Sequence, residues 1–296
     1  MAFRFGTVAM IGKPNVGKST LVNALVGQKV SIVSPKPQTT RRRVLGIAQG
    51  DDYQIAFIDT PGIHEPHTRL GRAMVNQARS AMGDIDLLVF VVDGGGLPDD
   101  IDKSIGKQVL AAGQPCLLVI NKMDHLKAEN VIETVEAYSK LCNPVEVMMT
   151  TATRGINLDK LQEMILSRIP EGEPLFGEDE FTDQSSRFMT AEFVREKILL
   201  ATRQEVPHAV AVRILEWEDG PERTIILAEI LVEKPSQRGI LIGKGGQFLK
   251  KIGSEARPEI EELVDRPVYL ELHVKVQEGW RMNPRVIHEL EYDSES

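Results

Sequence analysis

"GKPNVGKST", residues 12–20, decides the class of fold. Its spacing, Gly-x-x-x-x-Gly-Lys-Ser, is that of a phosphate-binding loop, and the apolar run at 7–11 before it predicts a strand. In such a loop, backbone N–H groups and the N-terminus of the next helix converge on phosphate oxygens. Lys18 brings positive charge to the β- and γ-phosphates, and the Ser19 hydroxyl suits Mg²⁺. The predicted phosphate-binding residues are Gly12, Asn15, Gly17, Lys18, Ser19 and Thr20.

The flanking sequence predicts an α/β domain around a mostly parallel sheet. Apolar runs at 53–59, 86–93, 115–122 and 144–150 alternate with helical patterns such as 19–27 and 157–169. Near-continuous hydrophobicity is typical of strands that helices cover on both faces. The stretch 43–59 resembles a hairpin that turns at residues 50–52, so we expect one antiparallel edge strand.

"NKMD", residues 121–124, predicts a base-recognition site at the end of a strand. A carboxylate such as Asp124 can accept hydrogen bonds from guanine N1–H and N2–H₂, whereas adenine would leave its oxygens unpaired. Asn121 can hold the pocket loop, and the stem of Lys122 can cover the base. After the strand at 144–150, a backbone N–H of Thr151 or Ala152 could meet guanine O6, although a plain turn explains those residues almost as well.

"DTPG", residues 59–62, and "PKPQTTRRR", residues 35–43, predict the two mobile switches of a nucleotide-hydrolysing site. Asp59 can hold Mg²⁺ through water, and the Gly62 N–H can sense the γ-phosphate. Thr39 or Thr40 could complete the Mg²⁺ shell. The predicted metal residues are thus Ser19, Thr39, Thr40 and Asp59.

The chain length and the charge distribution predict a second domain. At 296 residues the chain suits two domains, and its net charge is −8. Residues 171–183 hold six acids and no base, so we expect an acidic linker over 171–186. We expect a first domain at 1–170, a small α+β domain at 187–284 and a tail at 285–296. No apolar run is long enough for a membrane span, so a cytoplasmic protein is expected, with peripheral contact at the inner face of the membrane left open.

"GILIGKGG", residues 239–246, lies within a predicted helix-strand-strand-loop-helix-strand order, with Pro258 placed to break the second helix. It lacks the spacing of a second phosphate-binding loop. A GxxG loop lets a sugar-phosphate backbone approach closely, and Ile240 and Ile242 would floor an apolar groove for bases. Trp280 could stack on a base or pack internally. The predicted RNA-binding residues are Ile240, Ile242, Gly243, Lys244, Gly245, Gly246, Lys250, Lys251, Trp280 and Arg281.

Together these motifs resemble one protein family. "GKPNVGKS", "TT", "DTPG" and "NKMD", in this order, resemble a translation-factor-class GTPase domain, and "PQTTR", "DTPGIH" and "IGKGG" resemble the Era family of bacterial ribosome-assembly GTPases. The resemblance implies a P-loop GTPase domain followed by a type II KH domain. It also implies GTP hydrolysis with Mg²⁺, single-stranded RNA near the 3′ end of 16S rRNA as ligand, and a role in small ribosomal subunit assembly. We expect a monomer. The alternative is a GTPase whose C-terminal domain contacts proteins.

The catalytic residues are predicted to be few. The position after "DTPG" is Ile63, whose side chain cannot orient a water, so chemistry relies on Lys18, Asp59, Gly62 and Mg²⁺, and slow intrinsic turnover is expected. Similar GTPases with an apolar residue there can use a K⁺ bound by the asparagine of the phosphate loop. Asn15 occupies that place, and a purely loop-stabilising role is the other interpretation.

Overall fold

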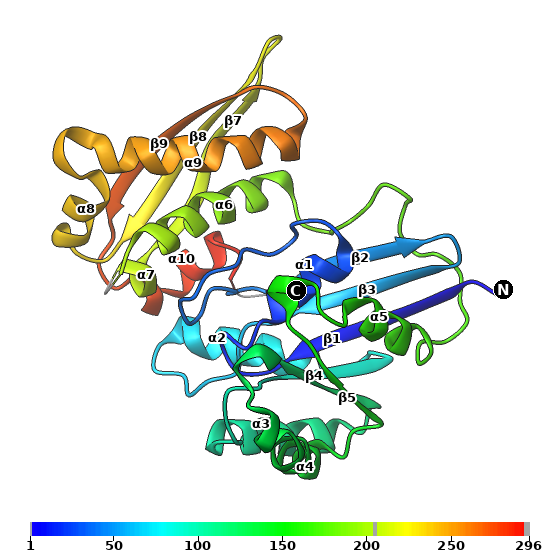
Figure 1. The fold of residues 1–296 in the computed structure, drawn as a ribbon. Coiled ribbons are helices and arrows are strands. Elements are labelled where there is room, and N and C mark those ends of the chain that lie inside the picture. Colours follow the sequence, from blue (N-terminus) through cyan, green and yellow to red (C-terminus); the bar gives the residue numbers. More distant parts are fainter. Residues whose placement is uncertain (1, 204–205, 293–296) are drawn as a thin grey trace. The chain divides into compact units, whose positions relative to one another are not determined.

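The computed structural model describes residues 2–203 and 206–292, which form two compact units (Figure 1). Each unit is a separate body with its own sheet. Unit 1 comprises Met1–Val33, Thr40–His67 and Gly71–Asp183, and unit 2 comprises Ser34–Thr39, Thr68–Leu70 and Gln184–Ser296.

Unit 1 contains a six-stranded sheet in the order β2-β3-β1-β4-β5-β6. Only β2 is antiparallel to its neighbour, and this confirms the predicted hairpin and the mostly parallel sheet. The strands are β1 (Arg4–Ile11), β2 (Val44–Gly50), β3 (Tyr53–Asp59), β4 (Leu87–Asp93), β5 (Cys116–Asn121) and β6 (Glu146–Met149).

Helices cover both faces of this sheet (Figure 1). Side chains alternate across a strand, so Val8 and Met10 join one core while Ala9 and Ile11 join the other. Helices α1 (Lys18–Val26) and α5 (Leu158–Leu166) pack on the first face; α2 (Arg69–Ser80), α3 (Asp100–Ala112) and α4 (Val131–Cys142) pack on the second. The carboxyl ends of the central strands therefore meet at one edge.

The acidic segment 171–183 belongs to unit 1 and is not a free linker over that length. Glu171 forms an isolated antiparallel β-bridge, through the backbone, with Arg4 on β1. Thr182 forms a second one with Gly46 on β2. The Thr182 hydroxyl also donates to the Leu45 carbonyl over 2.6 Å. These backbone bonds tie the segment to the sheet despite its acidity.

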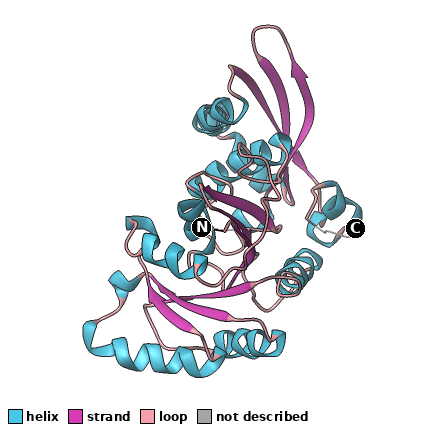
Figure 2. Cartoon of the chain, turned by 90° about the vertical axis from the view of Figure 1, so that its right-hand side faces the viewer, coloured by secondary structure: helices cyan, strands magenta, loops and turns pink. Residues whose placement is uncertain are grey.

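Unit 2 is built on a three-stranded sheet of order β7-β8-β9, with helices packed against it (Figure 2). β7 and β8 are antiparallel, whereas β8 and β9 are parallel. The strands are β7 (Ala211–Asp219), β8 (Thr224–Val232) and β9 (Val268–Val276); the helices are α6 (Ser186–Ala201), α7 (Val206–Ala209), α8 (Pro235–Ile242), α9 (Gln247–Val264) and α10 (Pro284–Glu289).

Three expectations for the second domain differ from the structure. Residues 239–242, expected in a loop, are the last part of a helix, α8. Pro235 suits the first turn of this helix, and Gln237 Oε1 accepts the N–H of Glu233 and of Lys234 at its start. Pro258 lies inside α9, which continues unbroken. The predicted tail forms α10 and buries Ile287 and Tyr292, while its last four residues lie outside the described part.

Within the described residues, no helix has both the length and the apolar character to cross a bilayer.

Candidate functional site

The phosphate-binding loop holds a buried lysine at its centre. Lys18 is 5% exposed, and its Nζ donates to the carbonyls of Gly12 (3.1 Å) and Lys13 (2.8 Å). Burial lowers the pKa of Lys18 to about 8, although the charge of Asp59 opposes that shift. Main-chain carbonyls thus hold the ammonium where phosphate oxygens can replace them.

Two hydroxyls and a carboxylate gather beside this loop. Ser19 Oγ donates to Asp59 Oδ2 over 2.6 Å and lies 2.8 Å from Thr40 Oγ1. Burial raises the pKa of Asp59, and hydrogen bonding by Ser19 and the charge of Lys18 oppose the rise. Among the described residues nothing hydrogen-bonds to the buried Asp59 Oδ1. Oxygen donors with one unsatisfied carboxylate oxygen fit a hard cation, so Ser19, Thr40 and Asp59 would hold Mg²⁺.

Thr39 does not join this cluster. Its hydroxyl donates to the Lys36 carbonyl over 2.7 Å and lies 2.7 Å from Ser34 Oγ, within a segment that belongs to unit 2. Of the two candidates, Thr40 therefore lies with Ser19, whereas the Thr39 hydroxyl is used inside its own loop; metal binding by either residue stays a prediction.

The "DTPG" turn packs directly on the phosphate-binding loop. A Cβ at Gly62 would lie 2.5 Å from the Pro14 nitrogen, so only glycine fits there, and the Ile63 N–H donates to the Gly12 carbonyl over 3.1 Å. Ile63 is itself buried. Its side chain thus serves packing, and this position lacks the water-orienting glutamine of other GTPases.

Asn121, at the end of β5, ties the base-recognition loops together. Its Nδ2 donates to the Val16 carbonyl over 2.8 Å, while its Oδ1 accepts from Thr150 Oγ1 and from the Ala152 N–H. The Ala152 N–H, one of the two considered for guanine O6, donates to Asn121 in this structure. Asp124 Oδ1 accepts from Thr151 Oγ1 over 3.3 Å, which orients the carboxylate proposed to select guanine.

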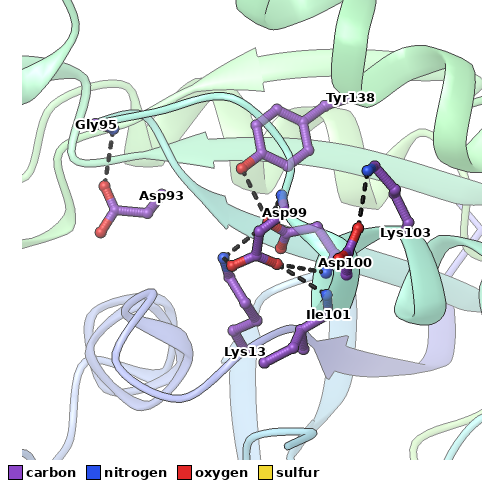
Figure 3. Close-up of polar contacts among 9 residues, drawn as sticks. Lys13, Asp93, Gly95, Asp99, Asp100, Ile101, Lys103 and Tyr138 are labelled. Atoms are coloured by element: carbon purple, nitrogen blue, oxygen red, sulfur yellow. Dashed lines mark hydrogen bonds and ion pairs between the residues drawn. The ribbon is translucent and has the colours of Figure 1, made fainter.

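Asp93, the last residue of β4, is a site residue that the sequence analysis missed. Its Oδ2 accepts from Lys122 Nζ over 2.8 Å. Its Oδ1 accepts from the Gly95 N–H, as Figure 3 shows. Burial raises the pKa of Asp93, but the hydrogen bonds from Lys122 and Gly95 outweigh it, so the net shift is downward. Lys122 Nζ also donates to the Asn15 carbonyl over 2.6 Å. The position of Asp93 at the carboxyl end of a parallel strand was the available signal.

Unit 2 carries a groove of about 360 Å³ between α9 and β9. The glycines of the GxxG loop have the positive φ angles that favour glycine: +71° at Gly243, +59° at Gly245 and +77° at Gly246. Lys244 is exposed between them. The groove is lined by Gly246, Leu249, Lys250, Gly253, Ser254, Arg257, Tyr269, Leu270, Glu271 and Leu272.

The predicted RNA-binding residues divide into two sets. Gly246 and Lys250 line the groove, whereas Ile240 is 55% exposed on α8 and neither it nor Ile242 contributes to the lining. Lys251 is exposed and pairs with Glu255. The sequence analysis missed Leu249, Gly253 and Arg257, which follow Gly246 at helical spacing along one face of α9.

Trp280 and Arg281 are both engaged within unit 2. Trp280 is fully buried, and its Nε1 donates to the Ala209 carbonyl over 2.8 Å. Of the two roles left open for Trp280, the structure therefore supports internal packing and not base stacking, since no ring face reaches solvent. Arg281 forms an ion pair with Glu233.

The geometry defines a P-loop protein built for a guanine nucleotide and joined to a unit with a GxxG loop and groove. Two family models match it: "50S ribosome-binding GTPase" over residues 7–122 and "KH domain" over residues 205–281. The class is a GTPase with a KH domain.

Relatives narrow this class to one family. GTPase Era of Heliobacterium modesticaldum (strain ATCC 51547 / Ice1) is 43% identical over 291 residues, which cover 98% of this chain and 97% of the relative. GTPase Era of Clostridium botulinum (strain Hall / ATCC 3502 / NCTC 13319 / Type A) is 45% identical, covering 98% of each chain. The chain belongs to the Era family of GTPases.

Solved structures agree with this assignment. A crystal structure of Era in complex with MgGDPNP and nucleotides 1506–1542 of 16S ribosomal RNA has a TM-score of 0.95 at 43% identity, covering 98% of this chain and 99% of the other. A substituted Aquifex aeolicus Era bound to GDP and AlF₄⁻ has a TM-score of 0.94, also at 43% identity, covering 98% and 100%.

Proposed function

We propose that this GTPase binds single-stranded RNA near the 3′ end of 16S rRNA in the α9–β9 groove and assists small ribosomal subunit assembly. The observation that carries the proposal is the GxxG loop beside a groove lined by Lys250 and Arg257. The glycines allow the sugar-phosphate backbone of RNA to approach closely, and the positive charges of Lys250 and Arg257 attract its phosphates. The Era structure crystallised with 16S rRNA nucleotides supports the choice of RNA.

Hydrolysis is assigned to the residues of unit 1. Lys18 places positive charge on the phosphates, and Asp124 accepts from the two guanine donors. Ser19, Thr40 and Asp59 would hold Mg²⁺, which when bound neutralises charge on the phosphate oxygens. Gly62, which packs against Pro14 of the phosphate-binding loop, is proposed to sense the γ-phosphate through its N–H. Because the buried Ile63 cannot orient water, slow intrinsic turnover follows.

The nucleotide is proposed to act as a switch. GTP orders the segments around Thr40 and Asp59, this changes how the KH domain is presented to RNA, and hydrolysis releases the protein. Since coupling between two sites is reciprocal, bound RNA would in turn favour the GTP-ordered state.

The test is a filter-binding titration with a single-stranded RNA of the 16S 3′ end at two salt concentrations. We expect tight binding at low salt that weakens at high salt. The variant Gly245→Asp places an acid in the loop and should lose most binding, whereas Gly239→Asp adds the same charge outside the groove lining, where a Cβ meets no atom within 4 Å. If the unsubstituted protein fails to bind at low salt, the alternative of a protein-contacting C-terminal domain is favoured.

We also propose that Asn15 is a K⁺ ligand. Asn15 has a φ of +64°, its side chain is exposed, and its carbonyl is held by Lys122. An asparagine at the protein surface, on a backbone held by Lys122, suits a monovalent cation. Single-turnover GTP hydrolysis should be faster in K⁺ than in Na⁺, and Asn15→Ala should remove the difference. Equal rates in the two salts would leave Asn15 a loop-stabilising residue.

The remaining proposals concern assembly and location. Both sites are built from residues of one chain, so we propose a monomer, which light scattering after size-exclusion chromatography tests. GTP and ribosomal RNA are cytoplasmic ligands, and this supports a cytoplasmic location. Peripheral membrane contact stays a prediction; co-sedimentation with anionic vesicles tests it.

A further inference from the structure

Lys13, the second residue of the phosphate-binding loop, reaches the start of α3. Its Nζ lies 2.8 Å from Asp99 Oδ2 and 2.7 Å from Asp102 Oδ2 (Figure 3). Burial lowers the pKa of Lys13, but the hydrogen bonds and charges of the two carboxylates outweigh it and raise the pKa above its ordinary value. The contact joins the loop that follows β1 to the helix that follows β4.

The two carboxylates are preorganised by the helix that carries them. Asp99 caps α3, its Oδ1 accepting from the N–H of Ile101 (2.9 Å) and of Asp102 (3.0 Å). Asp102 Oδ2 in turn accepts from the Asp99 N–H over 3.1 Å. This reciprocal capping box and the helix N-terminus favour negative charge at this point. The lysine therefore meets acceptors whose positions are already fixed.

Asp102 is a buried carboxylate that needs hydrogen-bond partners such as Lys13. Its side chain is buried, and burial raises its pKa, while the hydrogen bond from Lys13 opposes that rise. Tyr138 on α4 adds its hydroxyl, 3.3 Å from Asp102 Oδ2 (Figure 3). A buried carboxylate is tolerated only with such partners. We call the set the brace: Lys13, Asp99, Asp102 and Tyr138.

The main chain of Lys13 connects the brace to the phosphate site. Its carbonyl accepts from Lys18 Nζ over 2.8 Å, at the ammonium that faces the phosphates. The side chain of one residue is thus held by α3 while its backbone holds the central lysine of the loop. A shift of the Lys13 backbone would move the position that Lys18 takes.

We propose that the brace positions the phosphate-binding loop, so that Lys13 controls nucleotide affinity and hydrolysis through Lys18 without touching the nucleotide. Lys13, Asp99, Asp102 and Tyr138 are then positioning residues. A purely stabilising ion pair would have a different effect. Its loss would lower the free energy of unfolding and leave the rate of GDP release from folded protein unchanged.

The test measures release of a fluorescent GDP analogue by stopped flow, and single-turnover hydrolysis at saturating GTP, for Lys13→Met, Asp102→Asn and the double variant. Each single variant should release GDP about tenfold to a hundredfold faster, the scale of a misplacement of about 1 Å. The double variant should be no faster than the faster single variant, because both changes break one contact. Lys13→Arg, which keeps the charge, should restore slow release.

The matched control is Lys103→Met, which removes an exposed ion pair with Asp100 on the same helix and should leave release unchanged. Additive effects of Lys13→Met and Asp102→Asn would overturn the proposal, as would unchanged release in folded variants that only melt earlier. If Lys13→Met fails to fold, Tyr138→Phe removes only the hydroxyl; faster release from that variant supports the brace and unchanged release rejects it.

Discussion

At the scale of single residues, the buried ammonium of Lys18 has a consequence for nucleotide binding. Its pKa of about 8 leaves part of the ligand-free protein uncharged at this position in mildly basic solution. Phosphate oxygens stabilise the charged form and must raise the pKa of Lys18 when they bind. Binding therefore takes up a proton wherever the free lysine is already partly deprotonated.

We predict that GDP affinity falls as pH rises through about 8 and that binding takes up protons there. The uptake should be larger at about pH 8 than at about pH 7, because more of the free lysine is already deprotonated at the higher pH. Calorimetry in buffers with different ionisation enthalpies measures this uptake directly. Equal uptake at the two pH values would contradict the prediction.

The adjacent pair Thr39 and Thr40 offers a matched test of the metal site. Thr40 Oγ1 lies 2.8 Å from Ser19 Oγ, whereas the Thr39 hydroxyl bonds within its own loop. Thr40→Ala should raise the Mg²⁺ concentration needed for half-maximal GTP hydrolysis by about tenfold or more. Thr39→Ala should leave that concentration near the unsubstituted value. A Mg²⁺ titration of hydrolysis reads both, and equal effects would reject the assignment to Thr40.

At the scale of helices and strands, the sequence predicted unit 1 better than unit 2. The strands of unit 1 are long apolar runs, and its site residues follow them at one sheet edge, where motif spacing is informative. The run Ile240–Ile242 is too short to separate strand from helix, so α8 was missed. The α9–β9 groove depends on contacts between distant segments, and Trp280 became buried through such contacts, which no local pattern encodes.

Pro258 in the interior of α9 should cost stability. Proline there lacks an N–H and crowds the preceding turn, a penalty of about 3 kcal/mol relative to alanine. The restriction that proline imposes on the unfolded chain returns about 0.4–1 kcal/mol. We predict that Pro258→Ala raises the free energy of unfolding of unit 2 by about 2 kcal/mol, measured by urea denaturation. Glu262→Ala, at an exposed position of the same helix, is the control and should change it little.

The salt dependence of RNA affinity should distinguish the groove face of α9 from the neighbouring face of the same helix. Lys250 and Arg257 line the groove, whereas Lys251 does not and pairs with Glu255. Replacing Lys250 or Arg257 with glutamine should lower the slope of log affinity for single-stranded RNA against log salt by about 0.7 each. Lys251→Gln should change the slope less. RNA titrations at four salt concentrations provide the slopes. If only Lys251→Gln changed the slope, the RNA would contact the Lys251 face of α9 and not the groove face.

At the scale of the whole molecule, the peptide bond between Thr39 and Thr40 is one of the five places where the chain passes from one unit to the other. On the unit 2 side, the buried guanidinium of Arg195 donates to the Thr39 carbonyl and to Glu192. On the unit 1 side, Thr40 lies at the predicted Mg²⁺ site. We predict that a change at Thr40 acts on unit 2 through the Thr39 carbonyl that Arg195 holds.

Arg195→Met should weaken this transmission. The variant leaves the Thr39 carbonyl and Glu192 without the guanidinium, so the segment before Thr40 is no longer held. The ratio of RNA affinities in the GTP-analogue and GDP states should then move toward one. Arg187→Met, on an exposed position of the same helix, should keep the original ratio. Titrations with both nucleotides decide between these results, and an unaltered ratio in Arg195→Met would show that the coupling runs elsewhere.

The acidic segment that borders β2 also bears on how the protein behaves at high concentration. β2 is an outer strand, and an outer strand with free N–H and C=O groups can recruit a strand from another molecule. Here the Ile47 N–H already donates to the Phe181 carbonyl, and the segment's carboxylates give that border a repelling charge. The segment thus covers part of that edge, and we expect a shortened segment to leave the protein more prone to aggregate.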